Sequence, residues 1–258
     1  MQNTTIKQHL MKAFQQNMRL DGRGLEEFRK IEVELDISKT AEGSARVKIG
    51  DTEVLAGVKM IISNPFPDTP EDGAIMINAE FLPMASARFE SGPPGIESIE
   101  LARIVDRGLR ESKAIDVKKL CIKKGEKVWA VSVDIITMND DGNLLDAAAL
   151  ATILAVKHTR YPSFDGIEVD YKELTDTPLE ITKIPITVTV CKTGSYIFVD
   201  PVSEEESNID ARLTVTTMQD GNICALQKGG SMPLSLKDIS TMVDLAAKKA
   251  EELRELVK

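Results

Sequence analysis

The chain has 258 residues, of which 42% are hydrophobic and 28% charged. This is the composition of an ordinary globular protein, long enough to bury its own core without disulfides or structural metals. No apolar run reaches the ~18 residues that span a bilayer, and residues 1–14 have no signal-peptide core, so we expect a cytoplasmic protein. The net charge of −9 argues against a broad nucleic-acid surface, but not against a local one.

Cysteine and histidine are sparse. Cys121, Cys191 and Cys224 form no CxxC pair, which predicts reduced, buried thiols, and His9 and His158 lie near no cysteine. We therefore expect no zinc site, no cofactor and no Ser-His-Asp chemistry.

Helical and strand patterns alternate through the first part of the chain. Residues 3–18 predict an amphipathic helix, because apolar residues recur there at helical spacing, namely Ile6, Leu10, Phe14 and Met18. Alternating patterns then predict an antiparallel meander of three strands at 30–37, 44–49 and 53–62. Further strands are expected at 74–82 and 127–138. Ser98 is the expected N-cap of a helix at 98–113, and the apolar run 144–157 predicts a buried helix.

The second part of the chain repeats the order of strands followed by a helix. Residues 160–185 are polar and contain three prolines, which favours a linker. Strands are expected at 186–192, 195–200, 212–218 and 222–228, before a helix at 235–258. The pattern predicts an α+β duplication. We divide it into an N-terminal helix and loop at 1–29, a first domain at 30–163, a linker at 164–185 and a second domain at 186–258.

Several strings give this order a specific meaning. They are R-x-DGRG at 19–24, D-T-x-V-L-A at 51–56, the helix ELARIVDRGLRESKAID at 100–116, the apolar helix after NDDGN, and VDP-x-x-EEE at 199–206. Together they resemble the RNase PH superfamily and, within it, the non-catalytic ring subunit of archaeal exosomes. The resemblance implies an RNase PH-like fold of two βαβ-type halves. The first half is like ribosomal protein S5 domain 2, and the second is like the RNase PH C-terminal domain.

The resemblance also implies a phosphate site, which this chain has lost. Catalytic relatives carry Gly-Thr/Ser-Arg at the start of the buried helix, where this chain has Gly142, Asn143 and Leu144. Leucine cannot bind an anion, and Asp140 and Asp141 just before it would repel one. Paired arginines expected before the 98–113 helix are replaced by Ile96 and Glu97, so the required charge is reversed.

The acidic stretch that follows residue 199 departs from the active spacing. It runs Asp200-Pro201-Val202-Ser203-Glu204-Glu205-Glu206, followed by Asp210. A functional interpretation would make one of these carboxylates a metal ligand. We favour the simpler interpretation, a solvated acidic loop with no metal and no catalytic residue.

Three arginines of the 98–113 helix are the candidate RNA-binding residues. Arg103, Arg107 and Arg110 stand at i, i+4 and i+7 and share one face. In an arbitrary protein they would be a solvated stripe paired with nearby acids. The resemblance implies instead that Arg103 and Arg107 reach RNA at the partner's active site, while Arg110 is closer to the ordinary case. Arg88 is a weaker candidate.

We therefore predict a non-catalytic subunit of an archaeal exosome ring that supports 3′-to-5′ phosphorolytic degradation of single-stranded RNA. The implied partners are a catalytic RNase PH-like subunit, paired with it in three heterodimers of a hexameric ring, and cap proteins with S1 or KH domains. One alternative is an active phosphate-dependent 3′-to-5′ exoribonuclease. Another is a small-molecule enzyme, although neither GxGxxG nor GxxxxGK[ST] is present.

Overall fold

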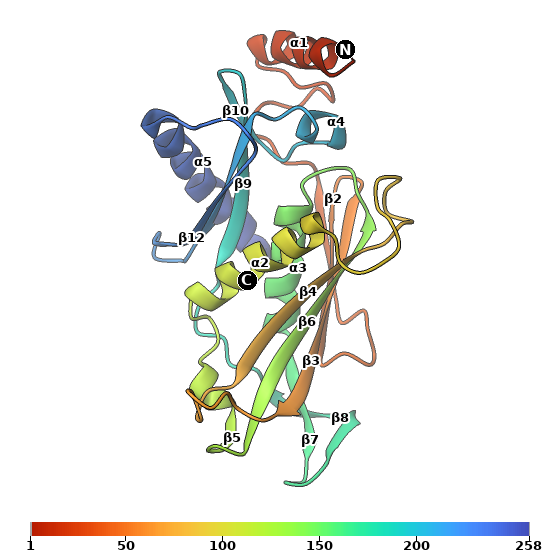
Figure 1. The fold of residues 1–258 in the computed structure, drawn as a ribbon, viewed down its shortest axis with the longest axis vertical. Helices are drawn as coiled ribbons and strands as arrows, with labels where there is room; N and C mark the ends of the chain where they lie inside the picture. The colour runs from red at the N-terminus through yellow and green to blue at the C-terminus, as the bar shows by residue number, and fades with distance from the viewer. Residues whose placement is uncertain (1, 258) are drawn as a thin grey trace.

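The computed structural model describes residues 2–257, with side chains from Ile6 onward, and its main elements are two β-sheets with helices between and around them (Figure 1). The first sheet has the order β1-β2-β3-β6-β4, with β5 beside β6. Its strands are β1 (Ile31–Leu35), β2 (Gly43–Ile49), β3 (Thr52–Ser63), β4 (Ala74–Phe81), β5 (Cys121–Lys123) and β6 (Lys127–Asn139). The expected antiparallel meander β1-β2-β3 is confirmed.

Strands β4 and β6 are parallel, because the chain crosses over between them through helix α2 (Ile96–Glu111) and the short 3-10 helix η1 (Val117–Leu120). This crossover is the βαβ unit of the first half. It leaves β4 at the edge of the sheet and places α2 beside it.

The second sheet has the order β10-β9-β11-β12, and all its neighbours are antiparallel. Its strands are β9 (Ile186–Thr193), β10 (Tyr196–Val199), β11 (Ala211–Thr217) and β12 (Ile223–Gly229). Strands β10 and β11 run parallel to each other on either side of β9, joined through the short helix α4 (Ser203–Glu206). The second half is therefore also of βαβ type, with a third strand inserted between the parallel pair. Helix α5 (Leu236–Arg254) packs on β9 and β11.

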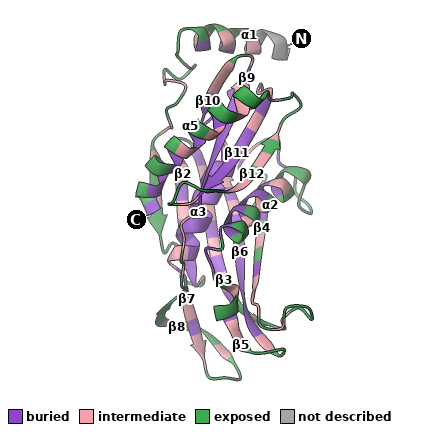
Figure 2. Cartoon of the chain, turned by 90° about the vertical axis from the view of Figure 1, so that its left-hand side faces the viewer, coloured by how far each residue is buried: buried purple, intermediate pink, exposed green. Residues whose placement is uncertain are grey.

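Helix α3 (Leu144–Lys157) connects the two halves. It contacts β2 and β3 of the first sheet and β9 of the second, and every residue from Leu144 to Val156 is buried (Figure 2). Its sequence, LLDAAALATILAV, offers no polar face to water, so burial on all sides is its stable environment. The expected buried helix is confirmed at its predicted bounds.

A small second core holds the N-terminal helix α1 (Gln2–Gln15) against the second sheet. It consists of Leu10 and Phe14 of α1 with Cys191 and Phe198 of β9 and β10. The Phe14 ring lies 5.0 Å from the Phe198 ring, centroid to centroid. The helix ends earlier than predicted, so Met18 is not on its apolar face but exposed.

The structure corrects several local predictions. Ser98 is not the N-cap of α2, because the helix begins at Ile96 and the Ser98 hydroxyl donates to the Gly95 carbonyl. The segment expected as an irregular linker contains a hairpin of β7 (Arg160–Phe164) and β8 (Val169–Pro178). Helix α5 ends at Arg254 and passes into the 3-10 turn η2 (Glu255–Val257), and Lys258 lies outside the described residues. Only Cys191 of the three thiols is fully buried.

Candidate functional site

The turn before α3 is fixed by backbone conformations that few residues adopt. Gly142 and Asn143 both have left-handed backbones, with φ of 82° and 61°. A Cβ at Gly142 would come within 2.5 Å of the Pro201 carbonyl oxygen, so only glycine fits against the chain that leads into α4. Leu144 follows and is buried in the core. The start of α3 is thus pressed against the acidic segment of the second half.

A cavity of about 250 Å³, which we call the α3 pocket, lies beside this turn. It brings together two positions that the sequence singled out, Glu97 of α2 and Leu144 of α3. The charged residues around it are three glutamates and two arginines: Glu97, Glu100, Glu206, Arg88 and Arg212. The pocket thus stands where the resemblance implies phosphate in catalytic relatives, but its lining is mixed and on balance acidic.

Both arginines of the α3 pocket are already paired. Arg88 donates to Asp140 at 2.9 Å and lies 3.9 Å from Glu97, while Arg212 lies 2.8 Å from Glu100. Burial raises the pKa of Glu206, and the negative charge of Asp140 adds to this effect. Arg88, Arg212 and the backbone N–H of Asn143 act in the opposite direction. The cations of the pocket are therefore neutralised by the chain itself.

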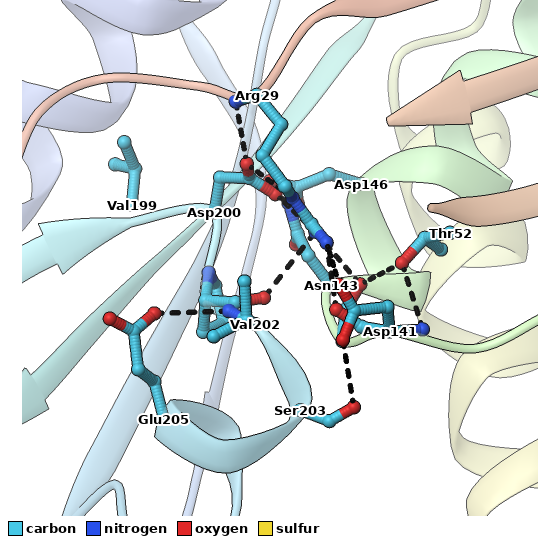
Figure 3. A network of polar contacts seen from close by, with 12 residues as sticks. Arg29, Thr52, Asp141, Asn143, Asp146, Val199, Asp200, Val202, Ser203 and Glu205 are labelled. Atoms are coloured by element: carbon cyan, nitrogen blue, oxygen red, sulfur yellow. Dashed lines mark hydrogen bonds and ion pairs between the residues drawn. The ribbon is translucent and has the colours of Figure 1, made fainter. Parts of the chain in front are cut away.

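The acidic segment is not the solvated loop that we expected. The side chains of Asp200 and Glu205 are fully buried. Arg29 donates to both carboxylate oxygens of Asp200, at 2.9 Å and 2.7 Å (Figure 3). Arg19 pairs with Glu205. Arg23 also contacts Asp200, at 2.8 Å. The interpretation was wrong because these carboxylates find guanidinium partners from a distant part of the chain.

This cluster, which we call the arginine clamp (Arg19, Arg23, Arg29, Asp200 and Glu205), joins three segments. Arg29 also donates to the carbonyl oxygens of Asp141 and Gly142, at 2.7 Å and 3.1 Å. Burial raises the pKa of Asp200, but the hydrogen bonds and charge of Arg29 outweigh it, so the pKa lies below its ordinary value. The sequence did not predict the roles of Arg19, Arg23 and Arg29 in the arginine clamp. The available signal was three arginines within residues 19–29 of an acidic chain.

Asp146, in the first turn of α3, is a different kind of buried acid. Its Oδ1 accepts from the backbone N–H of Thr189 in β9 at 2.8 Å, which ties the helix to the second sheet. Burial raises the pKa of Asp146 to about 8, although donors from Thr189 and Asn143 lower it in part. Asp146 therefore carries a proton at neutral pH, and it adds no negative charge to the start of α3.

The three candidate RNA-binding arginines leave α2 on its exposed face but reach different neighbours. Arg103 lines a groove of about 450 Å³ between α2 and β4. Arg107 donates to Oε1 of Gln227 in β12 at 2.8 Å. Arg110 donates to Asp106 at 2.7 Å and to the Ile75 carbonyl at 3.0 Å. Arg103 and Arg110 line the same groove, whereas Arg107 reaches β12 instead. Arg110 is held most firmly of the three.

The described residues hold no group of three or more His, Cys, Asp or Glu side chains placed to bind a metal ion. Nor does any helix in the described part of the chain have the length and apolar character to cross a membrane.

The two sheets packed around the shared helix α3 form an α+β scaffold of two βαβ-type halves. Family models match both halves: "3′ exoribonuclease family, domain 1" at residues 27–162 and "3′ exoribonuclease family, domain 2" at residues 183–249. The chain belongs to this RNase PH family of 3′ exoribonucleases.

Individual relatives show which members of this family the chain is similar to. The chain is 45% identical to "Exosome complex component Rrp42" of Methanopyrus kandleri, over 98% of this chain and 96% of that protein. It is 47% identical to the protein of the same name from Archaeoglobus fulgidus, over 98% of this chain and 95% of that protein. The resemblance to an archaeal exosome ring subunit that the sequence indicated is confirmed.

Solved structures of other proteins share the fold of this chain. A chain of the "archaeoglobus fulgidus exosome with RNA bound to the active site" matches with a TM-score of 0.92 and 46% identity, over 99% of both chains. A rice Rrp46 structure matches with a TM-score of 0.69 at 18% identity, over 93% of this chain and 98% of that one, and so shows the shared fold alone.

Proposed function

We propose that this chain is a ring subunit of an archaeal exosome that has no phosphorolytic site of its own and helps to hold RNA for a catalytic partner. One observation carries the proposal, the composition of the α3 pocket. Leu144 and three glutamates line the space where a phosphate ion would need free cations.

The nucleophile of phosphorolysis is inorganic phosphate. Phosphorolysis needs inorganic phosphate beside the RNA end, and a dianion is held only where cations and N–H donors exceed nearby carboxylates. Here Arg88 and Arg212 are bound to Asp140 and Glu100. Releasing either arginine for phosphate would leave a carboxylate unpaired, Asp140 being almost completely buried. An active enzyme would have to overcome this cost in every turnover.

The RNA contribution rests on α2. Arg103 faces an open groove, and Arg107 is held only by a neutral amide, so both guanidinium groups keep their charge available for phosphate oxygens. The partners that fit this role are a catalytic RNase PH-like subunit, three pairs of which close a six-membered ring, together with S1- or KH-domain cap proteins. The expected location is the cytoplasm.

The test is a phosphate-dependent RNA degradation assay. In an excess of inorganic phosphate, the purified chain alone should not shorten a 5′-labelled single-stranded RNA. The ring reconstituted with the catalytic subunit should degrade the same RNA. Phosphate-dependent shortening by the chain alone, at a rate that follows its own concentration, would contradict the proposal.

A further inference from the structure

The carboxylate of Glu206 faces the groups in the α3 pocket that could bind an anion. Glu206 ends α4 and lines the pocket together with Arg88 and Arg212. The Asn143 side chain does not cap α3, because its Nδ2 donates to Asp200 instead. The backbone N–H of Asn143 favours the charged form of Glu206 and so lowers its pKa in part. We propose that Glu206 is the chain's own anion in this pocket, and that its carboxylate takes the place of a tetrahedral oxyanion such as phosphate or sulfate.

The arrangement has the parts of an anion site in addition to the helix terminus. Two guanidinium groups come from different segments, Arg88 from the loop after β4 and Arg212 from β11. A helix N-terminus with an N–H donor completes the set. These parts converge on a cavity of about 250 Å³, which is large enough for one tetrahedral ion.

Charge explains why the wild-type pocket excludes the ion. Glu206 meets the field of both arginines, so an incoming dianion would find their attraction already used and would also be repelled by Glu206. Neutralising Glu206 removes one negative charge from the pocket, while Asp140 and Glu100 stay paired with Arg88 and Arg212. Glu97, whose side chain is 63% exposed, is screened by solvent. The neutralised pocket should therefore bind an anion weakly, but more tightly than the wild-type pocket.

The inference rests on the proposed function and deepens it, because it attributes the lack of phosphate binding in the α3 pocket to Glu206 as well as to Leu144. It predicts recovery of anion binding but not of phosphorolysis. Leu144 still contributes no cation at the start of α3, and the RNA end would still lack the second arginine that Glu97 replaces.

The experiment measures sulfate binding by calorimetry at low ionic strength, because sulfate keeps its charge between pH 5 and 8. The full-length variant Glu206→Gln should bind sulfate at least tenfold more tightly than wild type at pH 7.5. The matched control is Glu204→Gln, since Glu204 lies on the same short helix but is exposed. It should bind sulfate like wild type.

A second arm uses the wild-type chain and does not depend on a variant that folds. Sulfate binding by wild type should tighten as the pH falls, because burial raises the pKa of Glu206 above its ordinary value, and Glu206→Gln should show a smaller change. The other titratable or charged groups that face Glu206 are present in both proteins: Asp140, Arg88, Arg212, Glu97, Glu100 and the neutral thiol of Cys191.

Three results would overturn the inference: Glu206→Gln that folds and binds sulfate no better than Glu204→Gln, tight sulfate binding by wild type at pH 7.5, or wild-type binding that does not change with pH. If Glu206→Gln fails to bind sulfate while the wild-type chain degrades no RNA, this inference fails and the proposed function stands.

Discussion

At the scale of single residues, the neighbours of the three α2 arginines decide what each can do. Asp106 neutralises Arg110, and the Ile75 carbonyl fixes its position. Arg107 meets only the neutral Gln227, and Arg103 faces the groove between α2 and β4. A guanidinium that has no carboxylate partner loses nothing when it binds a phosphate. Arg103 and Arg107 can therefore bind RNA phosphates more readily than Arg110 can.

Replacing both Arg103 and Arg107 by glutamine should therefore weaken RNA binding by the assembled ring. Each charge-assisted contact contributes roughly 1.5–3 kcal/mol, so a loss of at least about tenfold is expected. The dependence of affinity on salt should also flatten by about two phosphate contacts. Filter binding at several salt concentrations measures both. Arg110→Gln is the matched control and should change RNA affinity little. Equal losses of affinity for all three arginines would instead indicate that they act as one solvated basic stripe.

At the scale of elements, the arginine clamp connects parts of the chain that no strand pairing joins. Asp200 directly follows β10, Arg29 precedes β1, and the carbonyls of Asp141 and Gly142 precede α3. One buried guanidinium therefore fixes the position of both halves relative to the start of α3. This explains why the RLDGRG segment and the VDP segment belong to one structural unit although they are far apart in sequence.

Asp200→Asn should lower the free energy of unfolding by about 3–5 kcal/mol, because it leaves buried guanidinium charge without its partner. Asparagine tolerates the left-handed backbone at this position, where φ is 48°, so the change removes charge and little else. Urea denaturation measures the loss, and Glu204→Gln, which alters an exposed side chain, should change stability by less than about 0.5 kcal/mol.

The Arg29–Asp200 pair also predicts how the free energy of unfolding changes with pH. Because the fold lowers the pKa of Asp200, its contribution is present above the pKa of about 3.9 in the unfolded chain, and it is lost as the pH falls through the folded value. Wild type should lose more stability than Asp200→Asn on acidification below pH 4. Parallel acid curves would mean that Asp200 titrates alike in both states.

At the scale of the whole molecule, edge strands and exposed apolar side chains indicate an incomplete surface. Strands β4 and β12 are sheet edges, and Met76, Ile96 and Ile99 around β4 are exposed. Soluble monomers usually cover or charge such edges, whereas subunits of a closed assembly pair them with a neighbour.

The chain should therefore co-purify with a catalytic RNase PH-like subunit as a ring of three heterodimers. Light scattering after gel filtration of the co-expressed subunits measures the mass, and native mass spectrometry gives the stoichiometry. A stable, soluble monomer that does not associate with the catalytic subunit at micromolar concentration would contradict the assembly.

The sequence by itself determined the elements and the family. Strand alternation, the unbroken apolar run of α3 and the strings from Arg19 to Glu206 are local patterns, and burial in the structure follows them. The sequence likewise predicts that Leu144 and Glu97 depart from a phosphate site, because each is a change of side chain at a recognisable position. The ends of α2 and the hairpin β7–β8 were missed, since capping and strand pairing there depend on neighbours.

Only the tertiary structure decided the state of the charges. Arg29 and Asp200 are 171 residues apart, and nothing in the local sequence of either says that the other will neutralise it. The same packing buries Asp200 and turns Glu206 toward Arg88 and Arg212. Ion pairing and desolvation depend on three-dimensional distance and burial, so an acidic run that reads as a solvated loop became the buried centre of this site.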